Sequence, residues 1–194
     1  MGAILEKVER QKDVVFAMNL IKIFSEEVFH HCYSVAELTE KMLENDETYS
    51  NHEKEEIVKG AVLHDIGKIF VPFNLTAAPK RLTEEEYLLI QTHTIIGYEV
   101  VNGSFSKIVE NVVRYHHEKP NGIGYTDGLK LAQIPREALL VQVADVYDAL
   151  VSDRAYKMGY DKKTALKLMQ LDSNNFKLDD EYYERLCSVI DEVD

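Results

Sequence analysis

The sequence predicts an all-α protein, and three observations support this fold class. Apolar side chains recur every three or four residues along much of the 194-residue chain, which is the spacing of one helix face. Helix-start signals, such as Ser25 and the pair Thr83 and Glu86, precede some of these segments. The chain has only 9 Gly and 4 Pro, most of them between residues 60 and 135, so both ends should be uninterrupted helix.

The expected helices follow one another along the whole chain. Residues 1–24 should form an N-terminal helix whose apolar side includes Val8, Val15, Leu20 and Ile23. This helix packs either on the core or on a second subunit, so a homodimer is one option. Ser25 should cap the next helix, and later helices are expected at residues 53–69, 83–102, 105–118, 138–151, 161–172 and 179–193.

Charge and cysteine content limit the class of protein. A net charge of −12 argues against binding to nucleic acid polymers or anionic membranes, because the long-range field repels polyanions. A small anionic substrate is still allowed if metal ions supply local positive charge. Cys32 and Cys187 are far apart and resemble reduced thiols. With no signal peptide and no long apolar run, these features predict a cytoplasmic protein without a membrane span.

The first candidate for chemistry is the stretch that contains His64, Asp65 and Lys68. An apolar helical run leads into three ionisable groups within five residues. Buried groups of this kind need ionic partners or a metal. The alternative is an ordinary salt-bridged helix end, and this stretch alone does not decide between the two.

Other expected helices also bring imidazole or carboxylate groups from mostly apolar faces. Each has an ordinary explanation: a surface Glu–His pair, a satisfied core histidine, imidazoles at a helix C-terminus, or acids paired with an arginine. Gly97, one turn after one of these histidines, leaves room for another helix or a ligand. The candidates outside the first stretch are Glu27, His31, His93, His116, His117, Asp145 and Asp148.

Taken together, these residues indicate a metal site in the core of a helical bundle. Histidine plus carboxylate without cysteine favours Fe or Mn, with Zn, Co or Ni as further options. The ligands are too many for one ion, so at least two ions are expected, with Asp65 as the natural bridge. Two adjacent ions suit in-line displacement at phosphorus by a bridging hydroxide. Lys68 would then hold a phosphate oxygen.

The motifs resemble a known family. The pattern of His31, then Leu63-His64-Asp65-Ile66-Gly67-Lys68, then His93 and Gly97, is similar to the HD superfamily of metal-dependent phosphohydrolases. The later stretches His116-His117-Glu118 with Gly122 and Tyr125, Val143 to Leu150, and Ser152 to Tyr156 resemble its HD-GYP subfamily. The resemblance implies an HD-domain helical bundle over residues 25–175, preceded by the 1–24 helix and followed by a C-terminal helix at 176–194.

The resemblance also implies an activity and a set of roles. It implies a phosphodiesterase that hydrolyses cyclic di-GMP to pGpG or GMP, with two or three divalent ions. Catalytic roles fall to Asp65 and Lys68. Metal ligation falls to His31, His64, Asp65, His93, His116, His117 and Asp145, with Glu27 where members with a third ion carry a ligand. Substrate contacts fall to Lys68, Asp148, Arg154, Asn121, Gly122 and Tyr125.

Three residues depart from the family pattern. Asn121 replaces an aspartate, and Thr126 and Ala155 replace prolines. Losing the proline at 126 should free the backbone of a loop that is implicated in substrate shape and in docking GGDEF-type partner proteins. Two alternatives therefore stay open. One is an HD phosphohydrolase for another cyclic or linear dinucleotide or a nucleoside phosphate, and the other is a silent module that binds a nucleotide or a partner.

Overall fold

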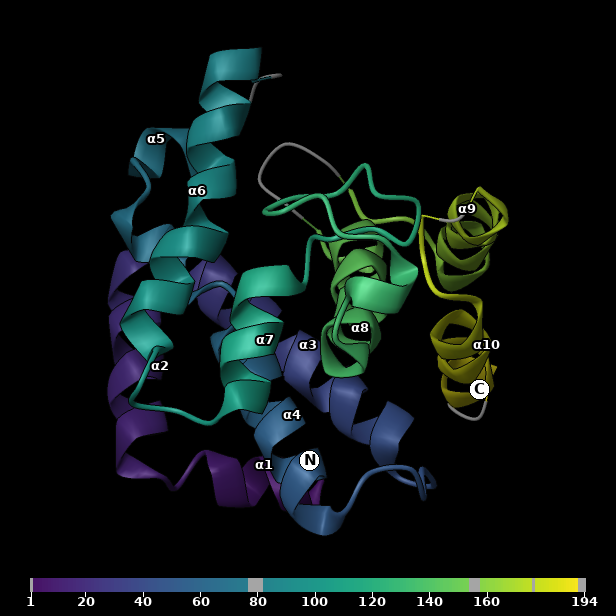
Figure 1. Ribbon diagram of the computed structural model, residues 1–194, viewed down its shortest axis with the longest axis horizontal. Coiled ribbons are helices and arrows are strands. Elements are labelled where there is room, and N and C mark those ends of the chain that lie inside the picture. Colours follow the sequence, from purple (N-terminus) through teal and green to yellow (C-terminus); the bar gives the residue numbers. More distant parts are fainter. Residues whose placement is uncertain (1, 77–81, 154–157, 176, 192–194) are drawn as a thin grey trace.

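The computed structural model describes residues 2–76, 82–153, 158–175 and 177–191 as a helical bundle (Figure 1). One isolated β-bridge joins Asn121 to Lys130. Among the described residues, no helix has both the length and the apolar character needed to cross a membrane. The helices are α1 (Ala3–Val8), α2 (Lys12–Phe24), α3 (Glu26–Leu43), α4 (Asn51–Leu63), the 3-10 helix η1 (Ile66–Phe70), α5 (Phe73–Thr76), α6 (Glu84–Val101), α7 (Lys107–Tyr115), the 3-10 helix η2 (Leu131–Gln133), α8 (Arg136–Val151), α9 (Lys162–Asn174) and α10 (Asp180–Asp191).

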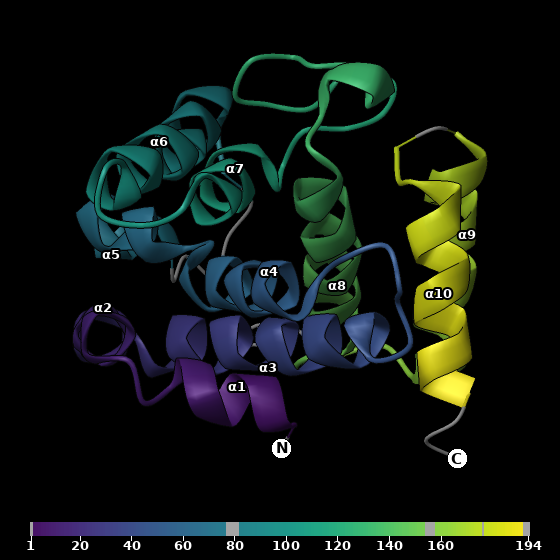
Figure 2. The same cartoon turned by 60° about the horizontal axis from the view of Figure 1, so that its bottom comes forward.

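The pair α3 and α4 forms the centre of the bundle. Helix α7 packs on α4, α8 packs on α3, and α6 packs on α7 and η1. Helices α1 and α2 cover the opposite side of the central pair, and α9 and α10 lie side by side along α8 (Figure 2). The all-α prediction is therefore confirmed, and the core is filled by aliphatic side chains such as Val35, Leu43, Ile57, Leu63, Val112 and Leu140.

Side-chain caps fix where several helices begin. The Oγ of Ser25 accepts the backbone N–H of Val28 (3.2 Å), as expected for the start of α3. Thr83 and Glu86 form the expected reciprocal capping box at α6. A second capping box, between Ser50 and Glu53, starts α4 two residues before the predicted position.

The single helix predicted for residues 1–24 is wrong. The chain forms α1 and α2 with a turn between them, because the buried residues Val8 and Val14 are six positions apart. Positions six apart lie about 120° from each other around a straight helix, and the turn lets each segment direct its own apolar side to the core. The apolar face of α2 was also assigned wrongly: Met18 and Ile21 point to the core, whereas Ile23 is 82% exposed.

The helix predicted for residues 53–69 is also interrupted. Helix α4 ends at Leu63, and η1 begins at Ile66 after a break at His64 and Asp65. The break brings Gly67 against α6, where a Cβ atom on Gly67 would lie 1.9 Å from the carbonyl O of His93. Gly97 provides the matching space on α6, since its own Cβ would meet Val113 at 2.9 Å. Gly97 therefore makes room for neighbouring elements, one of the two options predicted.

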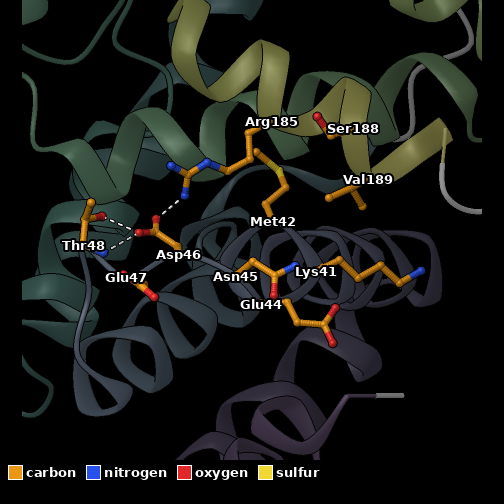
Figure 3. Close-up of a pocket in the computed structure, with 10 residues that line it drawn as sticks. All are labelled: Lys41, Met42, Glu44, Asn45, Asp46, Glu47, Thr48, Arg185, Ser188 and Val189. Atoms are coloured by element: carbon orange, nitrogen blue, oxygen red, sulfur yellow. Dashed lines mark hydrogen bonds and ion pairs between the residues drawn. The ribbon is translucent and has the colours of Figure 1, made fainter.

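The C-terminal helix α10 is joined to the α3–α4 loop by a buried ionic network beside a cavity of ≈ 610 Å³ (Figure 3). Asp46 accepts hydrogen bonds from the N–H (2.7 Å) and hydroxyl (2.5 Å) of Thr48 and pairs with Arg185. Burial alone would raise the pKa of Asp46, but these bonds outweigh burial and hold the pKa below its usual value of 3.8. The ionised form of Asp46 therefore stabilises the docking of α10.

We expect Asp46→Asn to lower the free energy of unfolding at pH 7 by about 1–3 kcal/mol, because a buried charged partner is lost. A group with a lowered pKa contributes stability above its unfolded pKa and loses it as the pH falls. The difference between wild type and Asp46→Asn should therefore shrink below about pH 4. Urea unfolding in the presence of EDTA, at pH 7 and at pH 3.5 (roughly half a unit below the unfolded pKa), measures the free energy of unfolding of the two proteins at each pH.

The matched control is Asp172→Asn, which removes a partly exposed pair with Lys177 (2.6 Å). This substitution should cost less than about 1 kcal/mol at either pH. An Asp46→Asn variant as stable as wild type at pH 7 would contradict the assigned role.

Candidate metal centre

The carboxylate of Asp65 lies at the centre of a buried cluster of imidazoles. Its Oδ1 lies 3.3 Å from Nε2 of His93 and 3.9 Å from Nε2 of His116. Its Oδ2 lies 3.4 Å from Nε2 of His64 and 3.8 Å from Nε2 of His31. Each oxygen therefore faces a different group of potential ligands, and Asp65 is shared by both groups.

The two groups contain the histidines that the sequence singled out. Asp65, His93, His116 and His117 form one group, and His31, His64 and Asp65 form the other; the ligand atoms of each group lie within 4.8 Å of one another. The chain delivers them from helix ends and helix faces. His64 caps the C-terminus of α4, His116 caps that of α7, and His31 and His93 project from α3 and α6.

Hydrogen bonds fix the tautomers of three buried histidines. Nδ1 of His64 lies 2.7 Å from the carbonyl O of Ala61, and Nδ1 of His93 lies 2.7 Å from that of Ile90. Nδ1 of His116 lies 3.1 Å from the carbonyl O of Val113. A carbonyl only accepts, so each Nδ1 donates and each neutral ring keeps a lone pair on Nε2.

These lone pairs point at one another. Nε2 of His93 and Nε2 of His116 are 3.3 Å apart, although neither can donate in its neutral form. Nε2 of His64 and Oδ1 of Asp65 are buried without a hydrogen-bond partner among the described residues. Buried acceptors of this kind are costly unless a cation satisfies them, and a divalent metal ion does so. The donor set therefore fits a metal centre.

Asp145 joins the same cluster from α8. Its Oδ1 lies 2.9 Å from Nε2 of His31 and 4.0 Å from Nε2 of His64, and its Oδ2 lies 3.9 Å from Nδ1 of His117. Asp145 therefore also faces both groups, in agreement with its predicted place in the site. The opposite nitrogen of His31, Nδ1, lies 2.6 Å from Oδ2 of Asp148. Nε2 of His31 is thus directed at Asp145.

The protonation states suit metal ligation. Burial lowers the pKa of His93 to about 4 and that of His117 to about 3, and burial together with His117 lowers the pKa of His116 well below its usual value. These rings are neutral at pH 7. Burial opposes ionisation of Asp65, but the Lys68 ammonium outweighs burial, so the pKa of Asp65 is held well below the usual range. The pKa of Asp145 is lowered in the same way, mainly by His31 against the effect of burial.

Two cationic side chains balance these carboxylates. Lys68 Nζ pairs with Oδ2 of Asp65, and its side chain is 22% exposed at the edge of the cluster. Burial lowers the pKa of Lys68, but Asp65 more than compensates, so the pKa is raised. Burial likewise opposes a charge on His31, yet hydrogen bonds to Asp145 and Asp148 raise its pKa to about 9.

Three predicted site residues have other surroundings than the sequence indicated, and a fourth lies outside the described residues. Glu27 is exposed and belongs to neither group of ligands. Asp148 is buried, with one oxygen on His31 and the other accepting from the hydroxyl of Ser152 (3.1 Å). The amide of Asn121 donates to the carbonyl O of Asn175 (3.2 Å) rather than to a cluster residue. Arg154 lies outside the described residues.

Tyr125, which the family resemblance assigns to the substrate, lies beside the cluster. Its ring centroid lies 4.8 Å from that of His117 and 6.4 Å from that of His93. Gly122 has a φ of +80°, which turns the same loop. Sequence reasoning missed Glu118, which is fully buried and binds the loop backbone. Its position directly between two ligand histidines and the glycine-rich loop was the available signal.

Comparison with known proteins identifies the family. A model described as an HD domain matches residues 16–182, so the chain belongs to the HD-domain family. The solved structure of Bd1817, an HDG"Y"P protein from Bdellovibrio bacteriovorus, superposes with a TM-score of 0.70 at 26% identity, over 84% of this chain and 52% of that chain. This likeness and the curated relatives below place the chain in the HD-GYP subfamily.

Two curated relatives show the range of activities among similar proteins. The cyclic di-GMP phosphodiesterase response regulator RpfG of Xanthomonas campestris is 42% identical over 60% of this chain and 32% of its own length. The 3'3'-cGAMP-specific phosphodiesterase 2 of Vibrio cholerae is 30% identical over 87% of this chain and 33% of its own length. The chain spans about a third of the length of these relatives.

We expect His116→Ala to weaken Mn²⁺ binding by at least roughly tenfold, because the buried group of four loses one ligand. Asp65→Asn should weaken binding at both groups, since each of its oxygens faces one of them. Titration of metal-free protein with Mn²⁺, followed by calorimetry, measures both effects. His30→Ala is the control, because His30 is exposed and neighbours His31. Wild-type affinity in His116→Ala would contradict the assignment of this group.

Proposed function

We propose that this chain is a metal-dependent phosphodiesterase that hydrolyses cyclic di-GMP to pGpG or GMP. The observation that carries the proposal is the position of Asp65, with one oxygen toward each of two groups of neutral imidazoles. Such a shared carboxylate is how a pair of ions is held a few ångströms apart. The similarity to the Xanthomonas phosphodiesterase over 60% of the chain supports the substrate class. We take residues 25–175 as the catalytic unit.

Each side chain has a defined part in this proposal. Two divalent ions, which we take to be Fe or Mn, would supply activation of water and neutralisation of charge on the phosphodiester. His93, His116 and His117 would hold one ion, His31 and His64 the other, and Asp65 would be common to both. Asp145 would add a carboxylate at the boundary between them. We infer two ions rather than three, because Glu27 is exposed and lies outside both groups.

Lys68 is the side chain best placed to contact the substrate. Its ammonium lies at the exposed edge of the cluster and is held there by Asp65. A phosphodiester approaching the cluster would meet this positive charge, which would stabilise negative charge on a phosphate oxygen. The metal ions and Lys68 together supply the local positive field that a chain of net charge −12 otherwise lacks.

A second candidate substrate is 3'3'-cGAMP. The Vibrio relative that is specific for this dinucleotide is similar over 87% of the chain, a larger share than RpfG covers. The departures at Asn121 and Thr126 lie in the loop that borders the cluster, so selection between bases is the property they would change. Docking of a GGDEF-type protein on this loop and formation of a homodimer stay predictions.

We expect metal-loaded protein, purified without oxygen, to hydrolyse cyclic di-GMP. Lys68→Met should lower kcat by roughly 100-fold with unchanged metal content, the size of effect seen for one charge-stabilising group. Chromatography of the products, with 3'3'-cGAMP, pGpG and a nucleoside monophosphate as alternative substrates, makes the measurement. The control is Lys163→Met, which removes an exposed lysine on α9.

The outcomes separate the alternatives. Faster turnover of 3'3'-cGAMP than of cyclic di-GMP would favour the second substrate. Turnover of mononucleotides alone would refute a cyclic-dinucleotide activity. Full metal content without hydrolysis of any nucleotide would support a binding module instead.

A further inference from the structure

The loop of residues 118–130 runs between α7 and α8 (Figure 2). It is fixed by a buried carboxylate, that of Glu118. The side chain of Glu118 is fully buried, and its oxygens accept the backbone N–H groups of Asp127 (2.5 Å), Gly128 (3.0 Å) and Leu129 (2.9 Å). Its own carbonyl O accepts the side-chain amide of Gln142 on α8. A carboxyl group in the interior needs such bonds, and here they hold the beginning and the return limb of the loop together.

Thr126 provides a second and independent attachment. Its hydroxyl lies 2.5 Å from the hydroxyl of Thr94, a fully buried residue of α6 next to His93. The same hydroxyl reaches the carbonyl O of Arg114 on α7 (3.4 Å), whose guanidinium binds the carboxylate of Asp127 at 3.0–3.2 Å. A proline at this position would have no hydroxyl for either bond. The loop is therefore tied to both α6 and α7, and these bonds would oppose the loosening expected from the loss of the proline.

Tyr125 lies between these two attachments. Its backbone N–H donates to the carbonyl O of His117 (3.2 Å), and its ring packs against that of His117 with a tilt of 35° between the planes. The ring of Tyr87 on α6 meets Tyr125 edge-on at 6.3 Å. Tyr125 is half-buried, so part of this residue remains accessible beside the ligand group. Aromatic rings placed in this way can stack on a nucleobase.

We propose that Thr126 is a positioning residue: its hydrogen bond to Thr94, together with the Glu118 carboxylate, holds Tyr125 as a fixed wall beside His117 against which a base of the substrate packs. The part that concerns the substrate rests on the proposed function. The part that concerns the loop does not, because it depends only on contacts within the chain. Thr126 acts through Tyr125 and does not itself touch the metal ligands.

The experiment uses the full chain with Thr126→Val, which keeps the shape and removes the hydroxyl, and Thr126→Ser, which keeps the hydroxyl. The control is Thr92→Val on α6, which removes a hydroxyl that donates to the carbonyl O of Leu89 (2.6 Å) in its own helix. Amide hydrogen exchange of residues 124–130 in metal-free protein is the first readout. The exchange rate should rise roughly fivefold to tenfold in Thr126→Val, because about one buried hydrogen bond is lost. It should match the wild-type rate in Thr126→Ser and Thr92→Val.

Steady-state kinetics of the metal-loaded protein with cyclic di-GMP is the second readout. Thr126→Val should raise KM roughly fivefold with kcat within about twofold and with unchanged metal content, because a binding wall is loosened while the ligands stay in place. Unchanged exchange in Thr126→Val, or equal defects in the Val and Ser variants, would overturn the proposal. If wild type does not turn over cyclic di-GMP, the proposed function fails, and hydrogen exchange still decides whether Thr126 fixes the loop.

Discussion

The carboxylate of Asp65 is the group on which the centre of this structure depends. It is almost completely buried, and four imidazoles and one ammonium are arranged around its two oxygens. An isolated buried carboxylate would be protonated, yet the surrounding groups hold its pKa well below the usual range. Lys68 and a protonated His31 supply positive charge opposite Asp65 and Asp145. The chain itself thus supplies positive charge within the cluster, in a form that divalent ions can replace.

The bundle builds this cluster by ending helices at the right place. His64 and His116 lie at the C-terminal ends of α4 and α7, where side chains can converge instead of lining one stripe. The close approach of Gly67 to the backbone of His93 makes this convergence possible, because any larger residue would push η1 away from α6. The candidate metal centre and the core packing therefore rest on the same contacts.

The loop after His117 is fixed by contacts on two sides. Glu118 closes the loop from inside, and Thr126 attaches it to α6 and α7 through its hydroxyl. A residue that lacks the rigidity of proline can thus be fixed by hydrogen bonds to its neighbours. The wall beside the cluster is made by tertiary contacts rather than by the local stiffness of the backbone.

The sequence by itself determined the all-α class, the caps at Ser25 and Thr83, and the histidines and aspartates that converge. These features can be predicted from sequence because helical periodicity and capping are local, and because ionisable groups on apolar faces are rare unless they are paired or bind a ligand. Only the tertiary structure decided the break between Val8 and Val14, the end of α4 before His64, and the exclusion of Glu27 from both ligand groups. It also placed Asp148 on His31 and Glu118 under the loop. Each of these depends on which distant residues meet, and the spacing along one helix carries no information about the helix packed against it.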